Sequence, residues 1–296
     1  MTSRSIIIAL AAALAASPAC AAPDWARVDN ALGRSGAEQP DGVRRYSFPR
    51  SDLTVTLDGV QIRPALALGS WLAFQPAGNE AMLMGDLVLL ESEVNPVMSR
   101  LLESGLTVTA LHNHLLRSSP ATIYMHVHGH GDPARLAAAV RSALSLSATP
   151  LAPPSTSPAP QPAGPPEAAA LNRIVGAKGK ANGGVYQFSI PRRERITDAG
   201  MAVPPSMGLA TAINFQPTGS GRAVATGDFV LTAAEVTPVL RSLRANDIDV
   251  TALHNHLGQE QPRLFFMHFW GNGDATALAR GLKQALDLTA VRVAGR

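Results

Sequence analysis

The stretch that decides the fold is VTALHNHL, which occupies residues 108–115 and recurs letter for letter at residues 250–257. When residues 85–132 are written above residues 227–274, at a constant offset of 142 (250 minus 108), nearly half of the positions are identical without a gap. Self-similarity at a fixed offset indicates repeated structural units. The chain is therefore a tandem duplication.

The duplication divides the chain into four segments: a signal peptide at residues 1–22, a first repeat domain at 23–148, a Pro-rich linker at 149–167 and a second repeat domain at 168–296. The linker reads TPLAPPSTSPAPQPAGPP before its last residue, a composition that favours extended polyproline structure. Each repeat is long enough to bury about two thirds of its unfolded surface. We expect the two copies to fold separately.

The spacing of apolar residues and the positions of capping residues and prolines predict the same helices and strands in each copy. A capping residue precedes proline at Asn95-Pro96, Thr237-Pro238 and Asp132-Pro133, and each pair predicts a helix that begins at the proline. Alternating apolar runs predict strands, which in the first copy cover residues 43–48, 53–57, 71–75, 82–90, 106–114 and 122–130. Short helices are expected at residues 25–32 and 168–175. This order indicates an α+β unit, a mainly antiparallel sheet with helices packed on one side.

The amino-acid composition excludes several kinds of partner and metal site. The chain of 296 residues has 25 Lys and Arg against 22 Asp and Glu, so a net charge of +3 gives little field for binding nucleic acid. The one cysteine, Cys20, excludes a disulfide within the chain and any Cys-based zinc site. Histidine must supply any soft-metal ligands.

The N-terminus has the layout of a signal peptide. Arg4 precedes an apolar run at residues 6–16, and small residues follow around Ala19 and Ala21. The run is too short to span a bilayer, and we expect no transmembrane segment. We expect a periplasmic or secreted protein; lipoprotein anchoring through Cys20 is the less favoured alternative.

Several short motifs recur in both copies and carry a family resemblance: Phe-Gln-Pro, Gly-Asp-x-Val-Leu, Glu-Val-x-Pro-Val, Ala-Leu-His-Asn-His and Met-His. This combination resembles the LppY/LpqO family of exported bacterial proteins, which is defined by a domain of unknown function. The resemblance covers nearly all of both copies. It implies an exported, often duplicated domain and carries no established activity.

All 8 histidines fall into two clusters, one in each copy. Alternate residues of a strand point to one face, so the His-x-His pair and the His of the following Met-His converge if their strands form a hairpin. Three neutral imidazoles are a zinc ligand set, and imidazole also suits copper and nickel. The alternative is that the histidines are structural and satisfied by backbone carbonyls. The predicted metal ligands are His112, His114, His126, His254, His256 and His268.

Other polar residues leave alternatives open. His128 and His130 correspond to Trp270 and Asn272, so they are either an added ligand set of the first copy or solvent-facing residues. Glu93 and Glu235 are candidate catalytic bases or metal ligands, although a carboxylate at a helix N-terminus is also stabilised by the helix dipole. Asp86 and Asp228 indicate a bulge or a buried hydrogen-bond acceptor, and Gln75 and Gln216 orient a ligand or close a backbone network.

These features favour an exported binding protein that holds Zn, Cu, Ni or a small ligand at a His-rich site in each repeat. One alternative is a metal-dependent hydrolase that uses the His triad with a Glu base. Another is a cell-envelope interaction module without metal. The sequence does not decide between a catalytic and a binding role, and it gives no oligomeric state.

Processing provides the first test. Expression with the export machinery should give a mature chain that begins at Ala22 or Pro23, because cleavage after Ala21 follows the small-x-small pattern. Intact mass spectrometry measures this directly. Retention of residues 1–21 contradicts export by this route, and a diacylglycerol mass on Cys20 selects the lipoprotein alternative.

Overall fold

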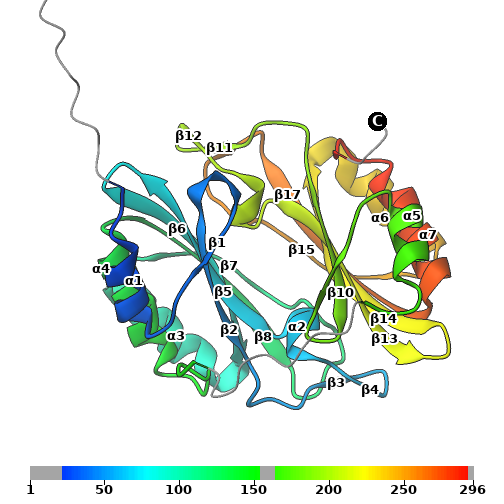
Figure 1. Ribbon diagram of the computed structural model, residues 1–296, viewed down its shortest axis with the longest axis horizontal. Helices are drawn as coiled ribbons and strands as arrows, with labels where there is room; N and C mark the ends of the chain where they lie inside the picture. Colours follow the sequence, from blue (N-terminus) through cyan, green and yellow to red (C-terminus); the bar gives the residue numbers. More distant parts are fainter. Residues whose placement is uncertain (1–21, 154–163, 293–296) are drawn as a thin grey trace, which may run out of the picture.

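A computed structural model describes residues 22–153 and 164–292 of the chain. It contains two six-stranded sheets, in which every named strand pair is antiparallel. The two sheets face each other, and the longer helices lie on their outer sides, whereas the short helix at Pro64–Ala67 lies between them (Figure 1). Nearly all of the predicted signal peptide and the centre of the predicted linker lie outside the described residues.

The first sheet has the strand order β1-β2-β5-β6-β8-β7. Its strands are β1 (Ala37–Glu38), β2 (Arg44–Pro49), β5 (Gly69–Ala77), β6 (Glu80–Leu90), β7 (Thr107–His112) and β8 (Thr122–Gly131). Its outer face carries the helices α1 (Trp25–Leu32), α3 (Glu91–Glu103) and α4 (Pro133–Leu144). The loops add η1 (Pro40–Gly42), β3 (Thr56–Leu57), β4 (Val60–Gln61) and α2 (Pro64–Ala67).

The second sheet repeats this arrangement in the order β15-β17-β14-β13-β10-β9. Its strands are β9 (Lys180–Asn182), β10 (Val185–Pro191), β13 (Ala210–Gly219), β14 (Arg222–Thr232), β15 (Asp249–His254) and β17 (Leu264–Asp274). Its helices are α5 (Ala168–Val175), α6 (Ala233–Ala245) and α7 (Ala275–Leu286). The loops add β11 (Thr197–Asp198), β12 (Met201–Ala202), η2 (Pro205–Met207) and β16 (Glu260–Gln261). The predicted α+β class and the duplication are confirmed.

The helix that follows the long central strand begins earlier than the prolines predicted. Helix α3 begins at Glu91 and keeps Pro96 inside, because the Glu93 carboxylate accepts the Leu90 backbone N–H and closes the first turn. Helix α6 does the same with Glu235 and Pro238. By contrast, α4 begins at Pro133 as predicted, with the Asp132 carboxylate capping its first turn at 2.8 Å from the Arg135 nitrogen.

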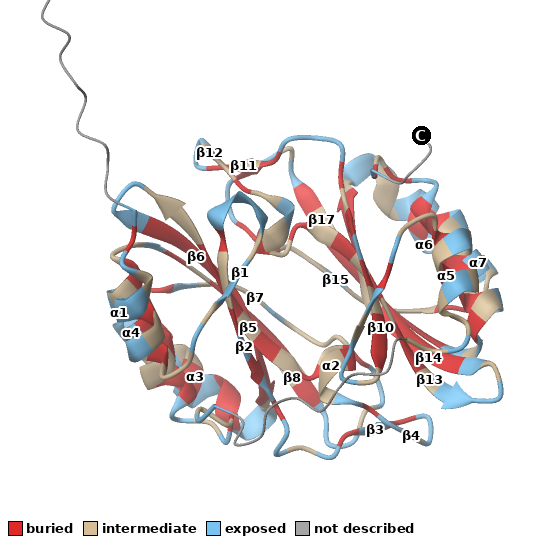
Figure 2. Cartoon of the chain, in the orientation of Figure 1, coloured by how far each residue is buried: buried red, intermediate tan, exposed pale blue. Residues whose placement is uncertain are grey.

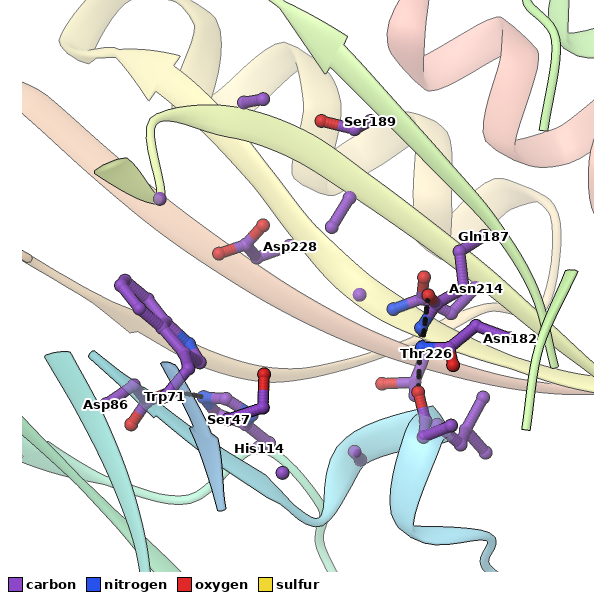
Figure 3. A pocket seen from close by; sticks show the side chains of 18 of the residues that line it. Ser47, Trp71, Asp86, His114, Asn182, Gln187, Ser189, Asn214, Thr226 and Asp228 are labelled. Carbon is purple, nitrogen blue, oxygen red and sulfur yellow. Dashed lines mark hydrogen bonds and ion pairs between the residues drawn. The ribbon is translucent and has the colours of Figure 1, made fainter. Parts of the chain in front are cut away.

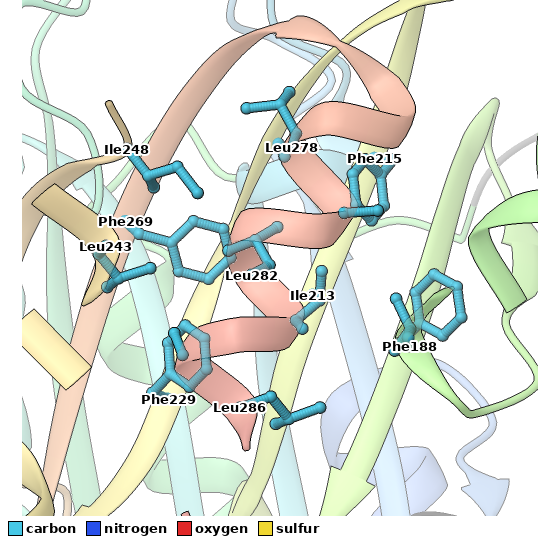
Figure 4. Packing of buried hydrophobic residues seen from close by; sticks show 14 of the residues in the cluster. Phe188, Ile213, Phe215, Phe229, Leu243, Ile248, Phe269, Leu278, Leu282 and Leu286 are labelled. Carbon is cyan, nitrogen blue, oxygen red and sulfur yellow. The ribbon is translucent and has the colours of Figure 1, made fainter. Parts of the chain in front are cut away.

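Each sheet packs a hydrophobic core against its own helices. In the first repeat Phe74, Leu83 and Met125 meet the helix residues Leu101 and Val140. The second repeat has the corresponding core, where Phe229 and Phe269 pack against Leu282 (Figure 4). Buried residues also line the inner faces of both sheets, so both sheets are covered on both sides (Figure 2).

Two further cores lie between the sheets and combine residues of both repeats. The loop around residues 53–68 packs Leu57 and Leu66 with Val224 and Trp270 of the second repeat. A second cluster joins residues of the first sheet to the loop around η2 and the inner face of the second sheet: Val43, Ala73, Met82 and Met84 with Ile196, Val203, Met207, Leu209, Val230, Leu257, Leu264 and Phe266. The repeats are therefore not separate packing units, because the inner face of each sheet is apolar and needs the other repeat to cover it.

Polar contacts join the same surfaces reciprocally. The Gln75 amide donates to the Ala202 carbonyl at 2.7 Å, and the Gln216 amide donates to the Gln61 carbonyl at 2.8 Å. Gln216 also accepts the Arg63 backbone N–H at 2.9 Å. The two glutamines close backbone networks between the repeats, one of the two roles that the sequence left open.

The start of the predicted linker also packs on the first repeat. Thr149 is buried, and the Arg34 guanidinium donates to the carbonyl oxygens of Pro150 and Leu151 at 3.1 Å and 3.0 Å. Hydrogen bonds to backbone carbonyls hold this segment even though its side chains supply little apolar surface. The packed part of the first repeat thus extends past residue 148.

The mixed cores predict that the repeats stay together after the chain is cut. Replacing residues 157–160 by a specific protease site and cleaving there should leave one particle of unchanged mass, because separation exposes both inner faces. Size-exclusion chromatography with light scattering measures this. Two half-mass peaks of folded protein would show that the interface is weak and that each repeat folds alone.

Candidate metal centre

Strand register sets the direction of the histidines on the inner faces. In the β7–β8 pair Ala110 lies opposite His126 and His112 lies opposite Tyr124. Opposed residues of antiparallel strands share a face, and so do residues two apart on one strand. His112 and His126 therefore project from the same face, as the like-parity pairing predicted.

The second repeat has the same register. His254 lies opposite Phe266, and His268 lies opposite Asp228. The remaining histidine of each set, His114 or His256, follows the end of its edge strand. Both triads thus project toward the space between the two sheets.

The six histidines form one cluster shared by the repeats. Three pairs, each with one ring from each repeat, have their ring centroids close together: His112 stacks on His254 at 3.5 Å, His114 stacks on His268 at 3.8 Å, and His126 lies tilted against His256 at 3.9 Å. The pairs are related by an approximate two-fold symmetry. When each histidine is replaced by its counterpart in the other repeat, the His114–His268 pair becomes the His126–His256 pair, and the His112–His254 pair becomes itself. Face-to-face packing of the sheets thus brings both predicted triads into one cluster. The triad predicted for the first repeat, His112, His114 and His126, is itself a group that could hold a metal ion.

Backbone contacts hold the loops that carry His114 and His256. The Thr109 hydroxyl donates to the His256 carbonyl at 2.6 Å, and its counterpart Thr251 donates to the His114 carbonyl at 2.7 Å. Each repeat therefore fixes the histidine loop of the other. The cluster is a product of the interface rather than of either repeat.

Hydrogen bonds define the tautomers of two cluster histidines. His254 Nδ1 donates to the Asn255 carbonyl and His268 Nδ1 donates to the Gly227 carbonyl, both at 3.0 Å. A carbonyl oxygen only accepts, and a neutral imidazole has one N–H, so both Nε2 atoms carry lone pairs. These two Nε2 atoms lie 2.9 Å apart. Lone pairs at this distance repel each other unless a cation lies between them.

A proton is a poor candidate for that cation. Burial lowers the pKa of His254 to about 4 and, together with the nearby His254, lowers that of His112 to about 3. Burial also holds the pKa of the four other cluster imidazoles, His114, His126, His256 and His268, well below the usual value. The cluster is therefore neutral at physiological pH.

Several ring nitrogens of the cluster make no hydrogen bond to a described residue. The Nε2 atoms of His112, His114 and His126 and both ring nitrogens of His256 are buried without a hydrogen bond from any described residue. Each unsatisfied buried polar group costs about 1–3 kcal/mol. Three groups of three histidines have ligand atoms within 4.8 Å of one another: His112, His254 and His268; His112, His114 and His126; and His126, His254 and His256. The first and third of these groups mix the repeats.

Two buried carboxyl groups lie beside the cluster. Asp86 Oδ2 is 3.4 Å from His114 Nε2, and Asp228 Oδ2 is 3.9 Å from His256 Nε2. Burial raises the pKa of Asp86 to about 8, with the charge of Asp228 adding to the effect, and raises that of Asp228 to about 7. The strand pairing runs through both positions without a register shift, so neither aspartate marks a bulge.

A cavity of about 990 Å³ adjoins the cluster between the two sheets. His114, His256 and His268 line it together with Asp86 and Asp228. Figure 3 shows residues of both repeats around this space, with Trp71 and His114 on one side and Asn214 and Gln187 on the other. The cavity gives small molecules a route to the cluster.

Glu93 and Glu235, the predicted bases, bind buried arginines rather than the cluster histidines. Glu93 accepts hydrogen bonds from Arg50 at 2.8 Å and from the backbone nitrogens of Leu90 and Ala148, and it does not line the cavity. Glu235 binds Arg192 at 2.7 Å; burial alone raises its pKa, but the hydrogen bonds from Arg192 and the backbone lower it overall. Both carboxylates stabilise a helix start and a buried arginine, so neither is free to act as a base, and the carboxyl groups beside the histidines are those of Asp86 and Asp228.

Sequence reasoning missed the two arginines. Arg50 and Arg192 are buried at the same offset of 142 (192 minus 50), each directly after a proline that ends a strand. Arg192 opens the basic run Arg192, Arg193 and Arg195, of which only Arg192 has a basic counterpart in the first copy. The shared Pro-Arg pair was the available signal.

The two histidines outside the cluster have separate environments. His128 is half-buried, and its Nε2 lies 3.5 Å from Asp198 of the second repeat; its counterpart Trp270 donates to Asp58 of the first at 2.8 Å. His130 is exposed, 3.4 Å from Glu80. His128 therefore contributes to the contact between the repeats, and neither residue joins a three-histidine group within the described ranges.

The buried imidazoles predict an acid-sensitive fold when metal is removed. Unfolded histidines bind protons near pH 6.5, whereas the folded cluster does not, so stability should rise from about pH 4.5 to about pH 6.5. Asp86 and Asp228 act oppositely, because their raised pKa values make stability fall as pH rises through about 7 and 8. Below pH 6.5 the six histidines change the free energy of unfolding more than the two carboxyl groups do, so stability still rises with pH.

Thermal unfolding in a chelator, followed by circular dichroism across this pH range, measures the effect. The double variant His112→Ala, His254→Ala should show a shallower rise than wild type. A melting temperature that does not change below pH 6.5 contradicts the buried, neutral state of the cluster.

The helices of the described ranges lack the combination of length and apolar character that crossing a bilayer requires. A search of the curated proteins found no match. One solved structure, a trimeric bacterial microcompartment shell protein PduB, aligns with 88% of this chain and 96% of its own at 11% identity. Its TM-score of 0.24 is too low to support an argument about fold or function.

A family described as a Domain of Unknown Function (DUF1259) matches residues 26–146 and again residues 169–288. The match confirms the two tandem copies, while the LppY/LpqO assignment stays a prediction. Its two regions coincide with the two sheets and their helices. The chain therefore belongs to the DUF1259 family and contains two copies of its domain.

Proposed function

We propose that the protein is an exported binding protein that holds one divalent transition-metal ion in the histidine cluster between its repeats. The observation that carries this proposal is the approach of His254 Nε2 and His268 Nε2 to 2.9 Å, with both Nδ1 atoms donating to carbonyls. Burial disfavours a proton between them, which leaves a metal ion as the cation. Two nitrogens bound to one tetrahedral zinc ion lie roughly 3.3 Å apart, close to this separation.

The donor set agrees with this proposal. Neutral imidazole is a ligand for zinc, copper and nickel, and the set contains no thiolate because the chain has no cysteine besides Cys20. The Asn255 and Gly227 carbonyls accept the Nδ1 hydrogens and turn Nε2 inward, as outer partners of metal-bound histidines do. The nearby Asp86 and Asp228 offset part of the charge of a divalent ion.

The overlap of the histidine groups supports one ion per chain rather than one per repeat. Any two of the three groups share a residue: His112, His126 or His254. If each histidine supplies one nitrogen, two groups cannot be filled at once. The shared position also explains why the cluster needs both repeats.

Binding is favoured over hydrolysis because the predicted bases are engaged elsewhere. Glu93 and Glu235 bind Arg50 and Arg192, and the hydrogen bonds that Glu235 accepts keep its pKa low. Export rests on the sequence of residues 1–22, whose charge, apolar run and small residues form a signal peptide. A periplasmic or secreted location exposes the protein to extracellular metal ions.

Metal titration tests the proposal. Untagged protein at pH 7.5 should bind about one equivalent of Zn²⁺, Cu²⁺ or Ni²⁺. The double variant His112→Ala, His254→Ala breaks all three groups and should weaken affinity by more than about 100-fold, the upper range for loss of an outer partner alone. Each single variant leaves one group intact and should keep weaker binding. Isothermal titration calorimetry measures both stoichiometry and affinity.

The matched control is His128→Ala, His130→Ala, which also removes two imidazoles but none of a three-histidine group. Its affinity should equal that of wild type. The low pKa values of His112 and His254 also predict that protons compete with the ion only below about pH 5. Equal binding by wild type and the His112, His254 variant would refute the metal function, and two equivalents would refute the shared centre.

A further inference from the structure

The cavity beside the cluster has features of a second binding site. Its volume of about 990 Å³ is far larger than a metal ion needs and lies at the upper end of small-molecule pockets. Asp86 and His256, which are 4% exposed, line it and have polar atoms without a partner among the described residues. Unsatisfied groups of this kind indicate a polar ligand.

The two walls of the cavity have diverged although the scaffold is duplicated. Arg45 lies opposite Ala73 on the first sheet, and Gln187 lies opposite Asn214 at the equivalent positions of the second. Two residues along the same strands, Trp71 lies opposite Asp86, and its counterpart Ala212 lies opposite Asp228. An indole and a guanidinium on one wall thus face amides on the other, which suits a ligand without two-fold symmetry.

The amide wall is suited to hydroxyl groups. Asn182 donates to Gln187 at 3.0 Å, and Gln187 donates to the Ala65 carbonyl at 2.8 Å, so both amides are held in place (Figure 3). The side chains of Asn214 and Ser189 make no hydrogen bond within the described part of the chain. Amide and hydroxyl groups both donate and accept, which matches the alternating hydroxyls of a polyol.

Positive charge is concentrated at the walls. Arg45 lies with its guanidinium 4.0 Å from the centre of the Trp71 ring, where it is fixed in place. Lys178 and Lys180 line the cavity as exposed residues and form no ion pair with a described residue. Asp86 and Asp228 lie against the histidines, where they offset the charge of the proposed metal ion. Asp86 also offsets part of the charge of Arg45, whereas Lys178 and Lys180 pair with no described acid, and together the three cations attract an anion.

We propose that this cavity binds a polyhydroxylated carboxylate, a ligand of the sugar-acid class, with its hydroxyls on the Asn214 wall and its anionic group near Arg45. The charge argument rests in part on the proposed metal ion, whereas the amide wall and Arg45 do not. The ligand therefore has a site of its own beside the metal centre.

Calorimetry on the full-length mature protein, loaded with zinc, compares three probes. Gluconate combines hydroxyls with a carboxylate, glucitol has only hydroxyls and acetate has only the carboxylate. Gluconate should bind at least about tenfold more tightly than either of the others, since it alone satisfies both walls. Equal affinity for gluconate and acetate, or no binding of gluconate, overturns the proposal.

Matched variants locate the site. Arg45→Gln installs the residue of the equivalent position in the second repeat and should weaken gluconate binding at least about tenfold. Arg44→Gln is the control, because Arg44 is the adjacent residue on β2, points to the opposite face near Trp25 and does not line the cavity. Equal losses in the two variants would overturn the assignment.

A second variant guards against misfolding of the first. Asn214→Asp keeps the shape of the side chain, places a negative charge on the amide wall and should weaken gluconate more than glucitol. Equal effects on the two probes contradict the proposed orientation. A zinc titration of the metal-free protein, run beside the gluconate titration, separates the two proposals: gluconate binding without any zinc binding refutes the metal centre alone, and zinc binding without gluconate binding refutes this site alone.

Discussion

Contact between two inner sheet faces is the interaction on which the rest of this structure depends. Each repeat contributes apolar residues and three histidines to this contact. When the faces meet, the apolar residues form two mixed cores. The same contact buries six imidazoles, lowers their pKa values and brings lone pairs of His254 and His268 to 2.9 Å. The proposed metal ion would offset that repulsion.

Duplication explains why so many contacts occur in pairs. Thr109 and Thr251 hold opposite histidine loops, and Gln75 and Gln216 bind opposite backbones. Because the two units have the same register, any inter-repeat contact made by one is available to the other. The exceptions are informative: Trp270 donates to Asp58, whereas its counterpart His128 lies against Asp198, and the walls of the cavity differ.

The acidic residues show how burial and partners separate structural from chemical roles. Glu93 and Glu235 are recurring acids, but each is neutralised by a buried arginine and by backbone N–H groups. Asp86 and Asp228 lie against histidines at the cavity, where burial outweighs the charge of Arg45 near Asp86 and the backbone hydrogen bond from Ala212 to Asp228, so their pKa values are raised. A recurring carboxylate in a sequence therefore gives no role until its neighbours are known.

The sequence alone determined the duplication, the α+β class and the six histidines, since all three depend on local spacing and strand alternation. It also placed His112 and His126 on one face, because residues two apart on a strand share a face whatever the fold. Tertiary structure alone decided that both triads form a single cluster. Which faces meet depends on the packing of whole sheets, and no local pattern near VTALHNHL encodes it. The same long-range packing buried Arg50 and Arg192, occupied Glu93 and Glu235, and opened the cavity beside Asp86 and Asp228.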